Sequence, residues 1–267
     1  MKIGYLQFKP VFGQPDKNIS KIREMISYRE FDLLVLPELA NSGYLFIDKS
    51  ELNDLSEDTE SGSFCAALRD LCREKNVHIV SGLCERSGDK FYNSSVLVRP
   101  DGKISVYRKI HLFDEEKLWF SPGDNFPEVF EIEGKNFGKV KIGMMICFDW
   151  FFPETSRSLA LNGAQIICHP SNLVMAYCQT AMFTRALENR VFTITANRIG
   201  SDVREYKELF FTGESVIVSP KGEYLCRGSI DKEEICIVEI DPDFALNKNL
   251  NDRNNIFTDR KKEFYNL

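Results

Sequence analysis

Three residues whose types suit covalent hydrolysis each follow an apolar run. Glu38 comes after LLVLP, Lys109 after ISVYR, and Cys147 after KIGMMI. In α/β folds, ligands bind in the crevice outside the carboxyl ends of the strands, so side chains at strand ends can converge there. A thiol nucleophile, a carboxylate base and an ammonium group that stabilises an oxyanion would together support hydrolysis. The pattern therefore favours nucleophilic catalysis by Cys147, assisted by Glu38 and Lys109.

Each of the three residues, taken alone, also has a plainer interpretation. Cys147 can be a small apolar residue that ends a strand, because free cysteines are often buried for packing. Glu38 can be a surface or helix-capping carboxylate, and Lys109 a solvated surface charge. Only their convergence at one place in the fold separates the catalytic hypothesis from these alternatives.

The elements that would position these residues alternate between strand and helix patterns. Helices are predicted where apolar residues recur at helical spacing or where a helix start and stop frame the segment, at 16–28, 63–75, 153–163 and 180–190. Strands are predicted at the apolar runs 2–8, 32–39, 77–86, 92–102, 139–147, 164–170 and 191–198. The segments 213–225 and 234–240 are interpreted as a hairpin-linked pair that closes the sheet. The alternation predicts an α/β fold with helices over one face of each of two sheets.

Composition and charge narrow the class of protein. The chain has 267 residues, 43% of them hydrophobic and 28% charged, and no interior linker, so a single domain over 1–267 is predicted. A polar tail at about 248–267 is expected to dock on another surface. The formal net charge of −6, without a basic stripe, argues against nucleic acid as a partner. Neither a signal peptide nor an apolar stretch near 20 residues is evident, which predicts a cytoplasmic protein without a membrane partner.

Eight cysteines are scattered through the chain, several of them within apolar runs. This distribution favours reduced thiols over a disulfide framework. Without a CxxC pair and with only three histidines, a zinc site would need unusual ligands, so no metal and no cofactor is predicted.

Taken together, these segments resemble the nitrilase superfamily of carbon-nitrogen hydrolases, whose members use a Glu, a Lys and a Cys in that chain order. The matching motifs are LLVLPELANSGY around Glu38, YRKIHLF around Lys109 and GMMICFDWFFPE around Cys147. Further agreement covers nearly the whole chain, at FSPGD (120–124), RALENRVFTITANRIG (185–200), FTGESVIVSPKGE (211–223) and DRKKEFY near the C-terminus.

The resemblance implies a four-layer α-β-β-α sandwich whose subunits pair as a homodimer or a higher homo-oligomer, with the tail reaching across the interface. It also implies a second glutamate after the lysine, for which Glu116 is the better match and Glu115 the fallback. Cys147 would attack the carbonyl carbon of a small amide, Glu38 would move the protons, and a thioester would form before water releases the acid. Lys109 and the backbone N–H of Phe148 would stabilise the oxyanion.

Side chains near these motifs are candidates for the substrate pocket. The substrate-binding candidates are Tyr44, Phe148, Trp150, His169 and Asn172. His111 could be imagined as the base of a Cys-His pair, but a packed or hydrogen-bonded histidine is the favoured interpretation.

Several functions remain open at this stage. A nitrilase would use the same three residues through a thioimidate, and an N-carbamoyl acid hydrolase would use them on a ureido group. Outside enzymes, the alternatives are a catalytically silent interaction module and a redox sensor that uses the Cys147 thiol. The presence of all three reactive residues disfavours the silent module.

Overall fold

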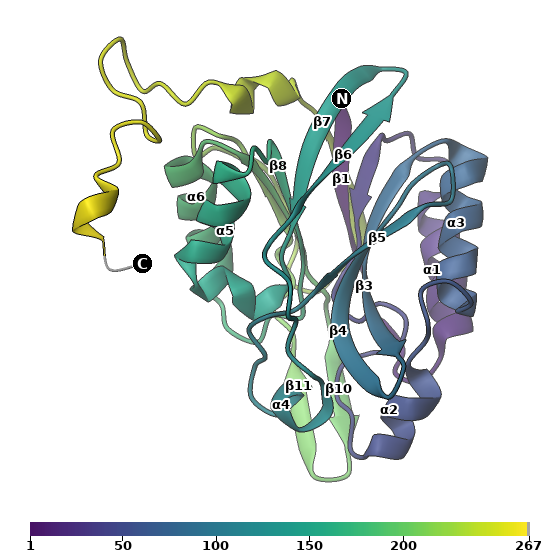
Figure 1. Cartoon of the computed structure of the whole chain (residues 1–267). Helices are drawn as coiled ribbons and strands as arrows, with labels where there is room; N and C mark the ends of the chain where they lie inside the picture. The colour runs from purple at the N-terminus through teal and green to yellow at the C-terminus, as the bar shows by residue number, and fades with distance from the viewer. Residues whose placement is uncertain (266–267) are drawn as a thin grey trace.

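The computed structural model describes residues 1–265, which form two six-stranded sheets packed face to face with helices on both outer sides (Figure 1). Helices α1 and α3 cover one sheet, whereas α5 and α6 cover the other. The α-helices are α1 (Pro15–Ile26), α2 (Lys49–Leu55), α3 (Ser63–Lys75), α4 (Glu116–Trp119), α5 (Pro153–Leu161) and α6 (Cys178–Asn189). The 3-10 helices are η1 (Cys147–Phe151), η2 (Pro242–Leu246) and η3 (Lys262–Phe264). The predicted four-layer sandwich is confirmed.

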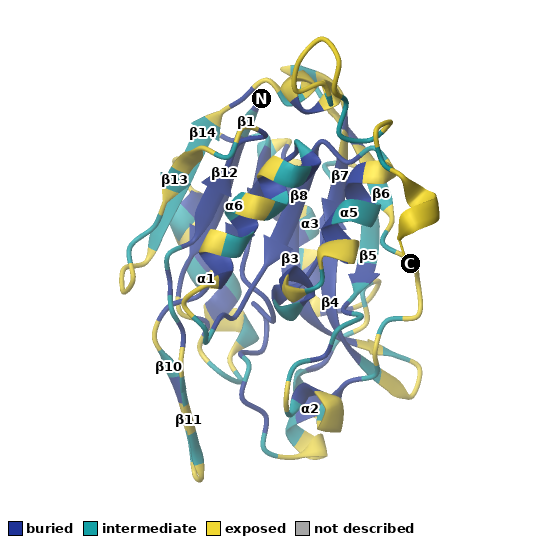
Figure 2. Cartoon of the chain, turned by 90° about the vertical axis from the view of Figure 1, so that its left-hand side faces the viewer, coloured by how far each residue is buried: buried dark blue, intermediate teal, exposed yellow. Residues whose placement is uncertain are grey.

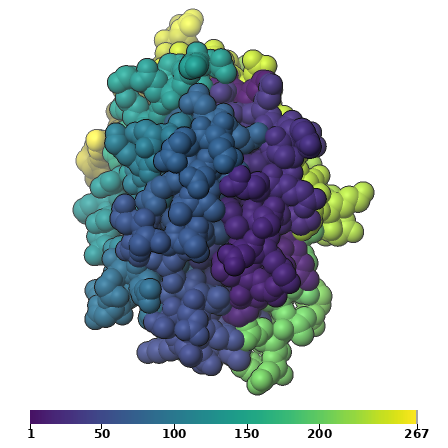
Figure 3. Space-filling view, turned by 90° about the vertical axis from the view of Figure 1, so that its right-hand side faces the viewer, coloured from purple at the N-terminus to yellow at the C-terminus, as the bar shows by residue number. Residues whose placement is uncertain are grey.

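The first sheet has the strand order β14-β1-β2-β3-β4-β5. Its strands are β1 (Lys2–Gln7), β2 (Leu33–Val35), β3 (His78–Ser87), β4 (Lys90–Val98), β5 (Ile104–Arg108) and β14 (Glu234–Glu239). Strands β1, β2 and β3 run parallel, so their carboxyl ends lie at one edge of the sheet. Figure 3 shows the outer face over this sheet, which the N-terminal part of the chain forms.

The second sheet has the order β13-β12-β9-β8-β7-β6, with a parallel centre at β7, β8 and β9. Its strands are β6 (Val129–Gly134), β7 (Phe137–Met144), β8 (Ile166–Pro170), β9 (Phe192–Ala196), β12 (Val216–Val218) and β13 (Tyr224–Arg227). A separate hairpin, β10 (Ser201–Arg204) with β11 (Lys207–Phe210), projects from the body of the molecule near α4 (Figure 1).

Alternation along the short strand β2 shows how the layers are held together. Leu33 and Val35 belong to the core between the two sheets, whereas Leu34 belongs to the core between the first sheet and its helices. All three side chains are fully buried, because successive strand residues point to opposite faces that are both covered. Figure 2 shows the resulting dark, buried sheets beneath partly exposed helices.

Two expectations about the last strands and the cysteines were wrong. Segments 213–225 and 234–240 do not form one hairpin: β12 and β13 pair within the second sheet, and β14 instead joins the first sheet beside β1. The predicted reduced state fails at Cys226 and Cys236, which form a disulfide between β13 and β14. These two cysteines are only half-buried on edge strands of different sheets that lie side by side, a proximity that local sequence does not reveal. The other six cysteines of the chain are free and buried.

The polar tail lies against the second helical layer and then leaves the body (Figure 1). Lys248 donates through Nζ to the carbonyl oxygens of Asn189 and Arg190 at the end of α6, while its ammonium lies over the ring of Phe257. Farther on, Phe264 is 79% exposed. A role for this tail at a subunit interface stays a prediction, and its last two positions lie outside the described residues. Across residues 1–265, no helix is long and apolar enough to cross a membrane.

Candidate active site

The carboxyl ends of β2, β5 and β7 deliver Glu38, Lys109 and Cys147 to one buried cluster. Lys109 Nζ lies 2.7 Å from Glu38 Oε1 and 2.8 Å from Glu116 Oε1. All four side chains are buried, and Cys147 is 7% exposed. The structure therefore brings together the nucleophile candidate, two carboxylates and the ammonium group that the sequence had singled out.

Glu38 is held by its neighbours on β3 and β4. A Cβ on Gly82 would lie 2.3 Å from Glu38 Cα, so only glycine lets β3 approach this loop so closely. Asn93 donates through Nδ2 to Glu38 Oε1 over 2.7 Å, and Asn172 donates to the Glu38 carbonyl. Among residues 1–265, no donor reaches the buried Glu38 Oε2. This oxygen is thus free to accept a proton.

Glu116, and not Glu115, is the glutamate of the cluster. It begins α4, and its Oε1 accepts hydrogen bonds from both Lys109 and the hydroxyl of Tyr44, the latter over 2.8 Å. Glu115 instead pairs with Lys207 on β11, over 2.9 Å. The two adjacent glutamates therefore have different ion-pair partners.

Cys147 begins η1 with a backbone φ of +38°, a left-handed conformation that costs an L-residue about 1–3 kcal/mol. Asp149 was not among the predicted site residues, yet its carboxylate holds this turn in place. It accepts hydrogen bonds from Ile146 N–H, the Tyr107 hydroxyl and His111 Nδ1, at 2.8–2.9 Å. An acid inside the apolar run CFDWFF was the available signal, because a buried carboxylate needs donors.

The cluster keeps its thiol protonated. Burial raises the pKa of Cys147 well above its usual value, and the Glu38 charge adds to this effect while Lys109 opposes it. For Lys109, burial disfavours the ammonium, but the carboxylates of Glu116 and Glu38 outweigh it, and the pKa is raised. Burial likewise raises the pKa of Glu116 against the opposing charge of Lys109. Any reaction at sulfur therefore has to begin with removal of the thiol proton.

The candidate pocket residues have different surroundings. Tyr44 is engaged with Glu116, and the Asn172 carbonyl lies 3.8 Å from Cys147 Sγ. Phe148 packs edge-on against Phe113, with ring centroids 5.1 Å apart. Trp150 belongs to the hydrophobic core, which favours a packing role for it.

His111 and His169 both contact residues of the turn that carries Cys147. The ring of His111 stacks on Phe152 at 3.7 Å and bonds Asp149, which agrees with the packed interpretation. His169 is fully buried, with Nε2 2.9 Å from the Cys147 carbonyl and Nδ1 3.1 Å from Thr195 Oγ1.

A small cavity of about 30 Å³ adjoins the cluster. Tyr44 and Glu116 belong both to the cluster and to its wall, and Phe113 lines it next to Phe148. Leu209 and Lys207 of the β10–β11 hairpin form part of the opposite wall. The cluster therefore has a small, largely aromatic space on the side formed by Tyr44 and Glu116.

Comparison with known proteins decides the family. A family model described as carbon-nitrogen hydrolase matches residues 2–245. The chain belongs to the carbon-nitrogen hydrolase family. A nitrilase from Pyrococcus abyssi is 46% identical over 268 residues, which cover 99% of each chain. An (R)-stereoselective amidase from a Pseudomonas species is 36% identical over 248 residues, which cover 91% of this chain and 86% of the relative.

Solved structures agree with this assignment. An amidase from Nesterenkonia sp. superposes with a TM-score of 0.80 and 25% identity, covering 98% of this chain and 94% of the amidase. The resemblance seen in the motifs is thereby confirmed, and the protein is an enzyme of the carbon-nitrogen hydrolase family.

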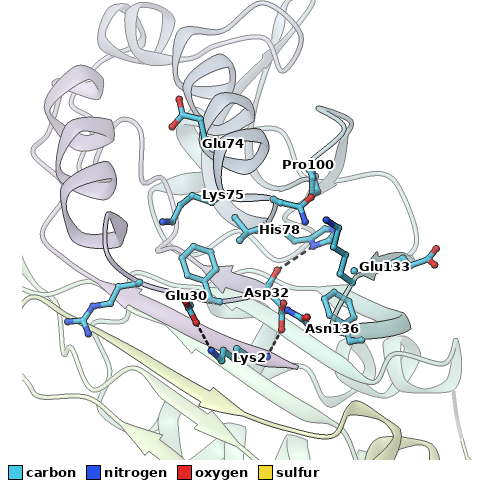
Figure 4. A pocket seen from close by; sticks show the side chains of 16 residues that line it. Lys2, Glu30, Asp32, Glu74, Lys75, His78, Pro100, Glu133 and Asn136 are labelled. Carbon is cyan, nitrogen blue, oxygen red and sulfur yellow. Dashed lines mark hydrogen bonds and ion pairs between the residues drawn. The ribbon is translucent and has the colours of Figure 1, made fainter.

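A larger cavity of this carbon-nitrogen hydrolase, about 850 Å³, lies away from the cluster. Lys2, Asp32 and His78 stand at the amino ends of β1, β2 and β3, opposite the ends that carry the site (Figure 4). Within its lining, Lys2 Nζ pairs with Glu30 at 2.8 Å. Among residues 1–265, no group of three or more His, Cys, Asp or Glu side chains is arranged to hold a metal ion.

His169 should make the stability of the enzyme depend on pH. Burial lowers its pKa from 6.5 to about 4, so the unfolded chain binds the proton more readily than the folded one between these values. Its contribution to stability is therefore present above pH 6.5 and is lost as the pH falls toward 4, by about 3 kcal/mol in total. Urea unfolding at pH 7 and pH 4.5 should show a smaller pH effect in His169→Asn than in wild type. Equal losses in the two proteins would contradict this account.

Proposed function

We propose that this enzyme hydrolyses the carbon-nitrogen bond of a small amide through a thioester on Cys147. The observation that carries the proposal is the buried cluster in which one ammonium bridges two carboxylates beside a thiol in a left-handed turn. Burying these charges costs desolvation free energy, which ion pairing only partly offsets. Clusters of this kind are typical of functional sites.

In the first half-reaction, Glu38 Oε2 takes the thiol proton while Sγ attacks the amide carbonyl carbon. The resulting oxyanion accepts hydrogen bonds from Lys109 Nζ and from the N–H of Phe148, which stands in the first turn of η1 where N–H groups lack intrahelical acceptors. Glu38 then returns the proton to the leaving nitrogen. The carbon-nitrogen bond breaks, ammonia departs, and the acyl group stays on sulfur as a thioester.

In the second half-reaction, Glu38 accepts a proton from water, and the hydroxide adds to the thioester carbonyl carbon. The same two donors stabilise the second oxyanion. Collapse breaks the carbon-sulfur bond, the carboxylic acid leaves, and sulfur regains its proton from Glu38. Glu116 and Tyr44 hold Lys109 in place throughout, because their mutual hydrogen bonds fix the ammonium.

Ammonia release from carboxamides, ureido acids and nitriles tests the proposal, with Cys147→Ala as the inactive control. We expect carboxamides to release ammonia with the native enzyme and not with the variant. Mass spectrometry should detect an acyl adduct on Cys147 when turnover is quenched. Normal turnover by folded Cys147→Ala would remove the thioester mechanism.

A nitrile substrate is the second candidate, favoured by the 46% identity to a protein named nitrilase. Sγ would then add to the nitrile carbon and form a thioimidate with the same residues. Preferential turnover of nitriles over the matching amides in the same panel would establish it in place of the amidase activity.

A further inference from the structure

The carbonyl group of Cys147 receives a hydrogen bond from the neighbouring strand. His169, on β8, is fully buried and places Nε2 2.9 Å from this oxygen. The next strand, β9, carries Thr195 directly beside His169 in the parallel register, with Oγ1 3.1 Å from Nδ1. A chain of hydrogen bonds therefore runs from β9 through β8 to the turn that follows β7.

The partners of the His169 ring decide which nitrogen carries the proton. A carbonyl oxygen only accepts, so Nε2 must carry the hydrogen that reaches Cys147. The Thr195 hydroxyl then donates to Nδ1. Ser171 Oγ, 3.1 Å from Nε2, donates its own hydrogen to the His169 carbonyl and accepts a share of the Nε2 hydrogen. His169 is therefore a neutral ring whose two nitrogens are both engaged inside the protein.

The Cys147 carbonyl and the Phe148 N–H belong to one peptide unit. In a planar trans peptide these two groups point in opposite directions, so a donor that fixes the carbonyl also fixes the direction of the N–H. Phe148 is the second residue of η1, where an N–H has no acceptor within the helix. A hydrogen bond to the carbonyl also polarises the peptide and makes its N–H a stronger donor.

The left-handed backbone of Cys147 makes such a tether necessary. A strained conformation persists only where the surrounding contacts hold it. Asp149 holds the turn on one side by accepting from the Ile146 N–H, and His169 holds it on the other by donating to the Cys147 carbonyl. The orientation of the peptide after the nucleophile therefore depends on His169.

We infer that His169 is a positioning residue of the reaction, which aims and polarises the Cys147–Phe148 peptide so that the Phe148 N–H stabilises the oxyanion. The inference rests on the proposed function, in which this N–H is one of two oxyanion donors. His169 acts through the peptide and exchanges no proton with the substrate. Its loss weakens stabilisation of the transition state and leaves ground-state binding and the thiol largely unchanged.

His169→Phe tests the inference, because it keeps a ring and removes the donor to the carbonyl. On the carboxamide that wild type hydrolyses fastest, kcat should fall by about 10- to 100-fold, less than the roughly 10²- to 10³-fold cost of losing a whole oxyanion donor. KM should change little, because the lost interaction is made only in the transition state. The aldehyde with the same acyl group forms a tetrahedral adduct on Cys147, so its inhibition constant should rise by about the factor by which kcat falls.

Alkylation separates the oxyanion donor from the nucleophile. Iodoacetamide reacts with Cys147 by displacement at a tetrahedral carbon, where no oxyanion forms. Its rate, followed by mass spectrometry of the modified residue, should be similar in His169→Phe and in wild type. A variant with general damage to the site would lose alkylation and turnover together.

His78 provides a matched control at the other end of the sheet. It is also a buried histidine whose ring lies against a backbone carbonyl, with Nδ1 3.3 Å from the oxygen of Asp32, but it stands at the amino end of β3. His78→Phe should lower the melting temperature and leave kcat as in wild type. The same melting measurement checks that each variant is folded.

Two conservative variants test the hydrogen bonds one at a time. His169→Gln should recover part of the lost kcat, because its amide N–H can reach the Cys147 carbonyl. Thr195→Val keeps the side-chain volume and removes the donor to Nδ1, so that the ring can turn an unprotonated Nε2 toward the carbonyl. It should lower kcat less than His169→Phe does, again with little change in KM.

Wild-type kcat and aldehyde inhibition in His169→Phe would overturn the inference, and so would a loss of turnover matched by an equal loss of alkylation. If His169→Phe does not fold, Thr195→Val decides, and unchanged kcat and inhibition in that variant would overturn it. Either result in an enzyme whose wild type hydrolyses carboxamides counts against the role of His169 alone. Absence of carboxamide hydrolysis by wild type counts against the proposed function and this role together.

Discussion

Glu38→Gln is expected to lower kcat/KM by about 100- to 10,000-fold, since a well-placed general base contributes about 10²- to 10⁴-fold. The substitution keeps the side-chain volume and leaves an acceptor oxygen for Asn93 and Lys109. It removes only the ability to take up the thiol proton. Steady-state ammonia release measures the loss, and the melting temperature should change little.

A second readout separates loss of the base from general damage. The Glu38 charge raises the pKa of Cys147, so the glutamine variant should alkylate with iodoacetamide at lower pH than wild type does. A more reactive thiol in a nearly inactive enzyme is the specific signature. Asn93→Leu, which removes the donor to Glu38 without adding a charge, provides the comparison in which the base itself is kept. A glutamine variant with more than about one per cent of wild-type turnover would exclude Glu38 as the base.

Lys109→Met is expected to abolish turnover and also to lower the free energy of unfolding by about 3–5 kcal/mol, because it leaves buried carboxylates unpaired. Glu38 and Glu116 both rely on Lys109 Nζ, at 2.7 and 2.8 Å. Urea unfolding measures the stability, and ammonia release the activity.

The double variant Lys109→Met with Glu116→Gln tells the two effects apart. Removing one of the orphaned charges should restore part of the lost stability and none of the activity. If the single variant were as stable as wild type, the ion cluster would not be held as described. If it were also active, Lys109 would have no place in the mechanism.

The layered fold could be predicted from the sequence because its signals are local. Strand β8 and helix α5 follow directly from the apolar run before Pro170 and from Pro153 and Gly163 as start and stop. The assignment of β14 to the first sheet was not predictable in this way. An edge strand chooses its neighbour by long-range packing, and EICIVEI fits either sheet by pattern alone.

The residues of the site likewise divide into those that local sequence predicts and those that depend on long-range contacts. Glu38, Lys109 and Cys147 follow from residue type, position at a strand end and motif order. Asp149 and Asn93 were not predicted, because their roles depend on side chains from distant parts of the chain: Asn93 donates to the Glu38 carboxylate, and Asp149 accepts from Tyr107 and His111. The effect of Lys109 on stability could not be predicted either, because it depends on the burial of both carboxylates that surround its ammonium.

The pairing of β14 with β1 also bears on how the chain reaches its native state during synthesis. Strand β1 is synthesised before β14, and β14, its neighbour at the edge of the sheet, is complete only at residue 239. Until then the first sheet has an unpaired edge at β1, a surface on which other nascent chains can add a strand. Contacts of such large sequence separation slow folding, so the rate-limiting step should be the docking of β14, late and after both sheets have begun to form.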